Sequence, residues 1–402
     1  MNDWLSVLGL IGYNSVGPIL NTEPSHSLEN MVVTAPILRW RVDVTPDQEN
    51  STSVEYSAPN VCGNDVFIGL SHHTGLQGYN MQHGYRSHTV PTDASVQMRP
   101  TVHHNTMVVA DLSGTVYAWD CTSFSSASPI SSLWKTELKI PINTEIVVDE
   151  SLLVVSTNGN VVYALNWQGE IVWRYEHRMN ASRKGNLQLF GAAKPLLTED
   201  IVFVGFSDGA VVSLDRTTGT AVSTAWNGAG RYPDIIAQPL QTTTGVVVSG
   251  FEQPTWQEHT GSVGWQHSFG ATHSAVLLSE NNGIYLVHPG SDGILRKIDS
   301  TTGTVIWEWD SGLQSALSTP VMLSDGNMLL SSSTGGMYIV DGQGTLVWQD
   351  LRTYSIDGIM QAPLVYGKQI FLLTKAGFLE MHENLSERQS LCRDVYCQWL
   401  EQ

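Results

Sequence analysis

The sequence predicts an all-β fold: an eight-bladed β-propeller whose four-stranded antiparallel blades form a closed ring. Three observations predict it. A strand–turn phrase recurs along the chain, a Trp follows this phrase at a regular distance, and an unpaired strand with its own Trp lies near the N-terminus.

The recurring phrase is a short apolar strand followed by a Thr/Gly turn and a Trp, as in SDGAVVSLDRTTGTAVSTAW (207–226) and SDGILRKIDSTTGTVIWEW (291–309). Its Gly permits a sharp turn, and the Asp that ends the strand can cap the next turn with its side chain. A period of about 40 residues with four short strands is typical of a propeller blade. The first strands of eight units are expected near Pro59, Pro100, Glu145, Pro195, Pro239, Ala275, Pro320 and Pro363.

A Trp ends the phrase in the second to seventh units. These residues are Trp134, Trp173, Trp226, Trp265, Trp307 and Trp348. The eighth unit has three strands and no such Trp, whereas residues 36–44 form a lone strand with Trp40. We expect 36–44 to complete the last blade, because closing the ring removes two exposed sheet edges. We also expect all seven Trp to pack between neighbouring blades, with each indole N–H donating to one partner.

Ring closure makes residues 35–390 one domain, with an expected insertion at 71–97 and a C-terminal tail at 391–402. Residues 1–34 contain no Lys or Arg and are interpreted as a leader or a packed extension. We expect no integral membrane span, because the apolar stretch at 4–20 is short and broken by Gly and Pro. Of the four cysteines, Cys392 and Cys397 could close a small loop, or all four could be ordinary buried thiols.

Charge narrows the classes of partner. Lys and Arg together number 20 against 38 Asp and Glu, which gives a formal net charge of −18. Nucleic acid and anionic membrane surfaces would be repelled, so neither is expected as a partner.

The repeats, including SGTVYAWD (113–120) and NGNVVYALNWQGEIVW (158–173), resemble the quinoprotein-like, or PQQ-like, β-propeller repeat over about residues 36–390. That family includes quinone-dependent dehydrogenases and non-catalytic scaffolds, and in size and blade count the chain is similar to the BamB-type outer-membrane assembly scaffolds. The dehydrogenases seat their quinone on an adjacent Cys pair, which this sequence lacks, so we predict no cofactor and no catalytic residues. The resemblance implies an extracytoplasmic scaffold, periplasmic, cell-surface or secreted, that binds a protein through the loops of one face. The absence of a lipidation Cys near the N-terminus leaves anchoring and the specific partner open.

The segment 71–97 departs from the repeat, and loops on rigid scaffolds often carry function. His72, His73, His83 and His88 are candidate metal ligands, since neutral imidazoles bind zinc or copper. Tyr79, Tyr85 and Arg86 suit a protein or glycan contact. His103 and His104 follow just beyond. A polar surface loop that is merely rich in His remains the structural alternative.

A second departure is 249–273, where Trp256, Glu258 and His259 crowd together. Glu258 and His259 are a candidate binding or acid–base pair. A short blade that turns at Gln253-Pro254 explains the same pattern without a function.

Overall fold

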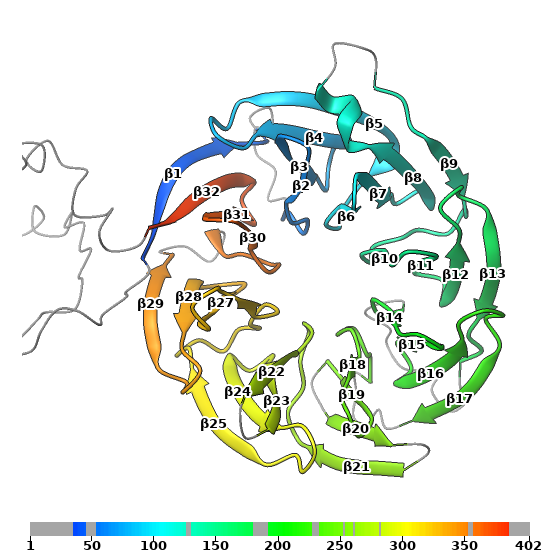
Figure 1. The fold of residues 1–402 in the computed structure, drawn as a ribbon, viewed down its shortest axis with the longest axis vertical. Helices are drawn as coiled ribbons and strands as arrows, with labels where there is room; N and C mark the ends of the chain where they lie inside the picture. Colours follow the sequence, from blue (N-terminus) through cyan, green and yellow to red (C-terminus); the bar gives the residue numbers. More distant parts are fainter. Residues whose placement is uncertain are drawn as a thin grey trace, which may run out of the picture.

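The computed structural model describes residues 35–45, 54–125, 130–179, 192–226, 233–251, 254–259, 262–280, 283–352 and 357–385. These residues form eight four-stranded antiparallel sheets around a central axis (Figure 1). The predicted all-β propeller of eight blades is therefore confirmed. The expected leader at 1–34 and tail at 391–402 lie outside the described residues.

Each of the first seven blades takes its strands in chain order, from an inner strand near the axis to an outer strand at the rim (Figure 1). The first three blades are β2 (Asn60–Cys62), β3 (Asp65–Gly69), β4 (Thr74–Asn80) and β5 (Arg86–Ser95); β6 (Thr101–His103), β7 (Thr106–Ala110), β8 (Thr115–Asp120) and β9 (Trp134–Glu137); and β10 (Val147–Val148), β11 (Leu153–Ser156), β12 (Val161–Leu165) and β13 (Ile171–Glu176). A 3-10 helix, η1 (Cys121–Ser125), follows β8.

The next four blades repeat this order. They are β14 (Leu196–Leu197), β15 (Ile201–Gly205), β16 (Ala210–Asp215) and β17 (Ala221–Trp226); β18 (Leu240–Gln241), β19 (Val246–Ser249), β20 (Thr255–His259) and β21 (Ser262–His267); β22 (Val276–Glu280), β23 (Gly283–Pro289), β24 (Ile294–Asp299) and β25 (Val305–Asp310); and β26 (Val321–Met322), β27 (Met328–Ser331), β28 (Gly336–Val340) and β29 (Leu346–Leu351). The eighth blade holds β30 (Leu364–Tyr366), β31 (Gln369–Leu373), β32 (Phe378–Leu385) and β1 (Ala35–Asp43). Every inner strand begins within two residues of its predicted anchor.

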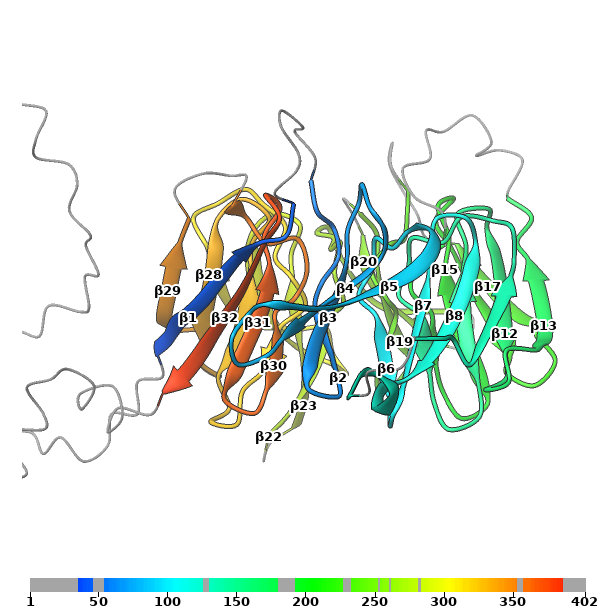
Figure 2. The same cartoon turned by 90° about the horizontal axis from the view of Figure 1, so that it is seen from above.

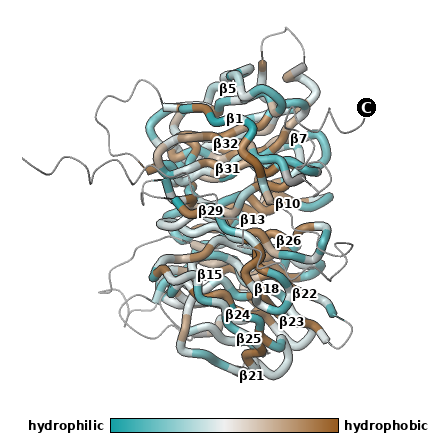
Figure 3. Tube along the Cα trace, turned by 90° about the vertical axis from the view of Figure 1, so that its left-hand side faces the viewer, coloured by the Kyte–Doolittle hydropathy of each residue, from teal (hydrophilic) through white to brown (hydrophobic). Residues whose placement is uncertain are grey.

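Burial explains the two kinds of strand pattern in the sequence. Middle strands such as β3 and β12 are buried at every position, because neighbouring blades cover both of their faces. Outer strands such as β25 alternate between half-buried and exposed residues, because one face meets solvent. In Figure 3 the hydrophobic stretches, in brown, lie within the stacked blades and alternate with hydrophilic ones in teal.

The turns carry the chemistry predicted from the repeat. The carboxylate of Asp215 accepts hydrogen bonds from the backbone N–H groups of Thr217 and Thr218 at 3.0 and 2.8 Å. Asp299 does the same for Thr301 and Thr302 at 3.0 and 2.7 Å. The hydrogen bonds to Thr218 lower the pKa of the Asp215 carboxyl. These aspartates therefore act as turn caps.

The N-terminal strand closes the ring as predicted. β1 pairs antiparallel with β32, and Trp40 lies opposite Met381. The paired strand runs from residue 35 to 43, one residue earlier than expected. Ion pairs add to the pairing, with Arg39 2.6 Å from Glu383 and Arg41 3.5 Å from the buried Glu380.

The recurring Trp side chains join neighbouring blades at most of the junctions. Trp173 contacts the Gly219 turn of the following blade, and its Nε1 donates to the carbonyl of Arg216 at 2.7 Å. Gly219 has a φ of 68°, and a Cβ there would lie 2.6 Å from the indole. Four other indoles donate in the same way to a backbone carbonyl of the next blade: Trp40, Trp134, Trp265 and Trp307. Trp348 packs in the core beside the last blade, and the side chain of Trp226 lies outside the described part.

The junction of the first and second blades, where the phrase has no Trp, is held by a disulfide. Cys62 on β2 is bonded to Cys121 at the start of η1, with 5.1 Å between their Cα atoms. Phe67 and Phe124 pack beside it with ring centroids 4.6 Å apart. The alternative that all four cysteines are ordinary buried thiols is therefore wrong, because the ring brings Cys62 and Cys121 together. Cys392 and Cys397 lie outside the described residues.

Residues 71–97, expected as an insertion, contain β4 and β5, the third and fourth strands of the first blade. β5 is ten residues long and its pairing with β4 shifts register at three points. The segment departs from the repeat because this outer strand is long and irregular.

Candidate functional site

Strand direction sorts the loops onto two faces of the ring, seen edge-on in Figure 2. Strands alternate in direction within a blade, so the turns after its first and third strands share one face, here called face I. The turns after the second strand and the links between blades share the other, face II. The predicted site residues can be placed on these two faces.

The four candidate histidines do not come together. His72 and His73 lie in the β3–β4 turn on face II, whereas His83 lies in the β4–β5 turn on face I. The seven residues of β4 separate these turns by roughly 23 Å. His88 lies on β5, where its Nε2 is 3.1 Å from a carboxylate oxygen of Asp65. One metal ion could not reach all four.

The aromatic candidates differ in exposure. Tyr79 is buried and donates its hydroxyl to Gln77, and burial raises its pKa to about 12. Tyr85 is 59% exposed, with its ring stacked on that of His83 at a centroid distance of 6.4 Å. Arg86 beside it is also exposed. Tyr85 and Arg86 are thus available to a partner, and Tyr79 is not.

A shallow cavity of about 500 Å³ adjoins this turn on face I, where the last blade meets the first. It is called here the closure cavity. Its lining residues are Arg39, Trp40, Gln82, His83, Gln369, Met381 and Glu383. The cavity thus combines both charge signs with apolar surface.

The second sequence departure belongs to the fifth blade. Trp256 lies on β20 and is completely buried among core residues that include Ile235 and Val248. Glu258 is half-buried on the same strand, and the side chain of His259 is outside the described part. Trp256 therefore serves packing rather than surface recognition.

A buried Ser–His contact near this blade lacks the properties of a catalytic pair. Ser249 Oγ and Thr255 Oγ1 lie 3.2 and 3.0 Å from Nε2 of His288. Burial lowers the pKa of His288 to about 3, and its ring is inaccessible. An imidazole with so low a pKa is too weak a base to abstract a proton from a serine at neutral pH.

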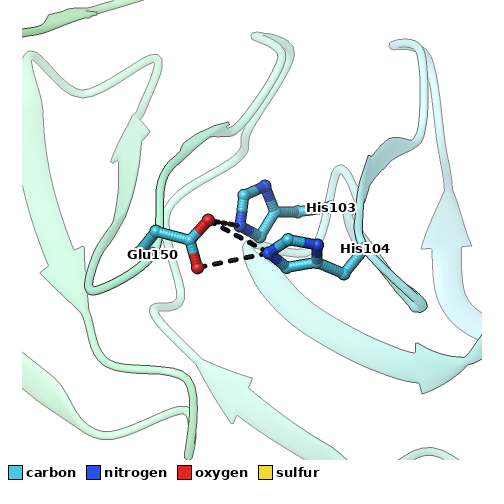
Figure 4. Close-up of side chains that lie close together, drawn as sticks. All are labelled: His103, His104 and Glu150. Atoms are coloured by element: carbon cyan, nitrogen blue, oxygen red, sulfur yellow. Dashed lines mark hydrogen bonds and ion pairs between the residues drawn. The ribbon is translucent and has the colours of Figure 1, made fainter.

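A compact group of potential ligand side chains, His103, His104 and Glu150, lies on face I (Figure 4). The histidines lie at the β6–β7 turn of the second blade, and Glu150 lies in the β10–β11 turn of the third. Oε1 of Glu150 is 3.5 Å from Nε2 of His103 and 3.0 Å from Nε2 of His104. The hydrogen bond from His104 lowers the pKa of the Glu150 carboxyl. Sequence reasoning noted the two histidines but missed Glu150, which lies 46 residues away.

Neighbouring groups hold this cluster in place. The ring of His103 stacks on Trp167 with centroids 5.3 Å apart, and Trp167 Nε1 donates to the carbonyl of Asp149 at 3.0 Å. Asp149 in turn pairs with Arg216 of the fourth blade at 2.5 Å. The two turns are therefore fixed relative to one another by the ring.

Comparison with known proteins identifies the family. The model of the family described as "Outer membrane protein assembly factor BamB" matches residues 96–227 and 234–389, which is most of the chain. The chain belongs to this family. A BamB of Legionella pneumophila is 28% identical over 209 residues, which cover 48% of this chain and 51% of that protein. The match thus spans about half the length of this relative. A BamB of Yersinia pestis is 21% identical over 398 residues, which cover 92% and 96% of the two chains.

Solved structures show the same fold as this BamB-family chain. The crystal structure of BamB from Moraxella catarrhalis has a TM-score of 0.68 at 16% identity and covers 87% of this chain and all of that one. A computationally designed protein, Ika8, has a TM-score of 0.62 at 15% identity, with 83% and 98% covered. Among the residues that the structure describes, no helix is long and apolar enough to span a membrane.

Proposed function

We propose that this chain is a non-catalytic scaffold in outer-membrane protein assembly and that it binds a protein partner through face I. Membership of the family described by that role is the observation that carries the proposal. The fold supports it, because a closed ring presents loops rigidly without needing a cofactor. The Cys62–Cys121 disulfide supports an extracytoplasmic, oxidising compartment.

The contact surface in this proposal is the β4–β5 turn with the closure cavity beside it. Tyr85 and Arg86 are exposed there, and aromatic and Arg side chains are enriched at protein interfaces. The cavity offers Arg39 and Glu383 for polar contacts and Met381 for apolar ones. A polypeptide segment with one apolar anchor and flanking polar groups fits this combination.

Co-purification from the native host under mild cross-linking tests the proposal. The full chain should recover a component of the outer-membrane protein assembly machinery, and the double variant Tyr85→Ala/Arg86→Ala should recover at least about tenfold less, the loss that about 1.4 kcal/mol produces. Tyr56→Ala is the matched control, because Tyr56 is 40% exposed and lies in the link before β2, on face II. Equal recovery by all three proteins would overturn this contact surface. Recovery of no assembly component by the unmodified chain would overturn the function.

A further inference from the structure

We propose that His103, His104 and Glu150 form a binding site for a divalent transition-metal ion of the zinc class. The predicted histidines at 72–88 take no part in it. The three side chains converge on face I between the second and third blades (Figure 4). The closure cavity lies elsewhere, where the last blade meets the first.

The spacing of the donor atoms suits such an ion. Zinc lies about 2.0–2.1 Å from its nitrogen and oxygen ligands in tetrahedral sites, which places two ligands of one ion roughly 3.3 Å apart. The observed separations of Glu150 Oε1 from the two histidine nitrogens are 3.5 and 3.0 Å. All three ligand atoms lie within 4.8 Å of one another. Small side-chain rotations would complete the coordination.

The chemistry of the donors points to the same class of ion. The two imidazoles are borderline donors that favour zinc and its neighbours over calcium and magnesium, which prefer oxygen ligands, and zinc also accepts a carboxylate as its third ligand. Nε2 of His103 is buried, and its contact with Oε1 of Glu150, at 3.5 Å, is too long for a good hydrogen bond. A metal ion held between the two atoms would give this nitrogen a closer partner.

The site is also held in position before any ion binds. His104 has a φ of 49°, and this left-handed conformation lets the chain reverse direction in the short β6–β7 turn. The carboxylate of Asp149 accepts hydrogen bonds from the N–H groups of Ser151 and Leu152, which shapes the turn that carries Glu150. Trp167 orients the His103 ring by stacking. Outer contacts of this kind commonly strengthen metal sites.

One coordination position would stay open to solvent. The side chains of His104 and Glu150 are 70% and 78% exposed, whereas His103 is 24% exposed. Three protein ligands therefore leave the fourth tetrahedral position for water or for a donor from a bound molecule.

Calorimetric titration of the tag-free full chain with Zn²⁺ tests this proposal. The unmodified chain should bind one equivalent. His104→Asn and Glu150→Gln should each bind at least about 100-fold more weakly, because even outer-shell changes alter affinity by about 10–100-fold. Asn tolerates the left-handed backbone and Gln keeps the shape of Glu, so both exposed variants should fold. His72→Ala, which removes an exposed His of face II, should bind like the unmodified chain.

Titration with Co²⁺ gives a second readout. The unmodified chain should develop the strong visible absorption of four-coordinate cobalt, and the two ligand variants should not. The proposal is overturned if the unmodified chain binds no zinc at micromolar concentration. It is equally overturned if Glu150→Gln and His104→Asn keep the full affinity, since the ion would then bind elsewhere.

Discussion

Removal of the Cys62–Cys121 disulfide should weaken the ring at the junction that has no Trp. The bond closes a loop of 59 residues. Reducing the bond raises the conformational entropy of the unfolded chain and so favours unfolding. A chain-entropy treatment gives about 4 kcal/mol at 25 °C for a loop of this length. The unfolding entropy of a domain of about 350 residues is roughly 0.7 kcal/mol/K, so the melting temperature should fall by about 6 °C.

Thermal melts followed by circular dichroism would measure this change. Both cysteines are nearly inaccessible, so the bond should be reduced in denaturant and the protein refolded before the melt. Reduced unmodified protein and the double variant Cys62→Ala/Cys121→Ala should melt at similar temperatures, both below the oxidised protein. Reductant should not shift the variant further unless Cys392 and Cys397 are also bonded.

The same melts can refute the reasoning. If the reduced protein and the double variant both melt within about 1 °C of the oxidised protein, the disulfide does not hold the junction. Packing of Phe67 and Phe124 would then be sufficient to join the two blades.

Two further predictions concern other junctions. Gly219→Ala should destabilise the fold by at least about 1 kcal/mol more than Gly326→Ala. Both glycines have positive φ, but only a Cβ at position 219 would press against Trp173. Urea unfolding of the two variants measures the difference. Glu380 is nearly inaccessible, and its hydrogen bonds to His382 and Arg352 lower its pKa to about 2. The ionised Glu380 should add on the order of 3 kcal/mol to the free energy of unfolding. This stabilisation should be present above about pH 4.5 and lost as the pH falls through 2. Urea unfolding across this pH range should show that the free energy of unfolding falls less in Glu380→Gln than in the unmodified protein. An equal fall in both proteins would contradict the stabilising role of the ionised Glu380.

The sequence by itself determined the repeat and the way in which the ring closes. Strand length, turn chemistry and the position of Trp40 are local features, and each recurs or is missing at a definite place in the repeat. Backbone preferences and burial act within one blade, so the same short pattern predicts the same hairpin each time. The Asp215 turn cap and the Trp173 contact followed from that pattern.

Only the tertiary structure decided which distant turns face one another. Cys62 and Cys121 are 59 residues apart, and His104 and Glu150 are 46 apart, yet each pair joins turns of neighbouring blades. The distance between two such turns depends on how closely the blades pack and how they rotate about the axis, which no single repeat specifies. For this reason the histidines at 72–88 seemed one cluster in the sequence, although β4 separates them onto opposite faces of the ring.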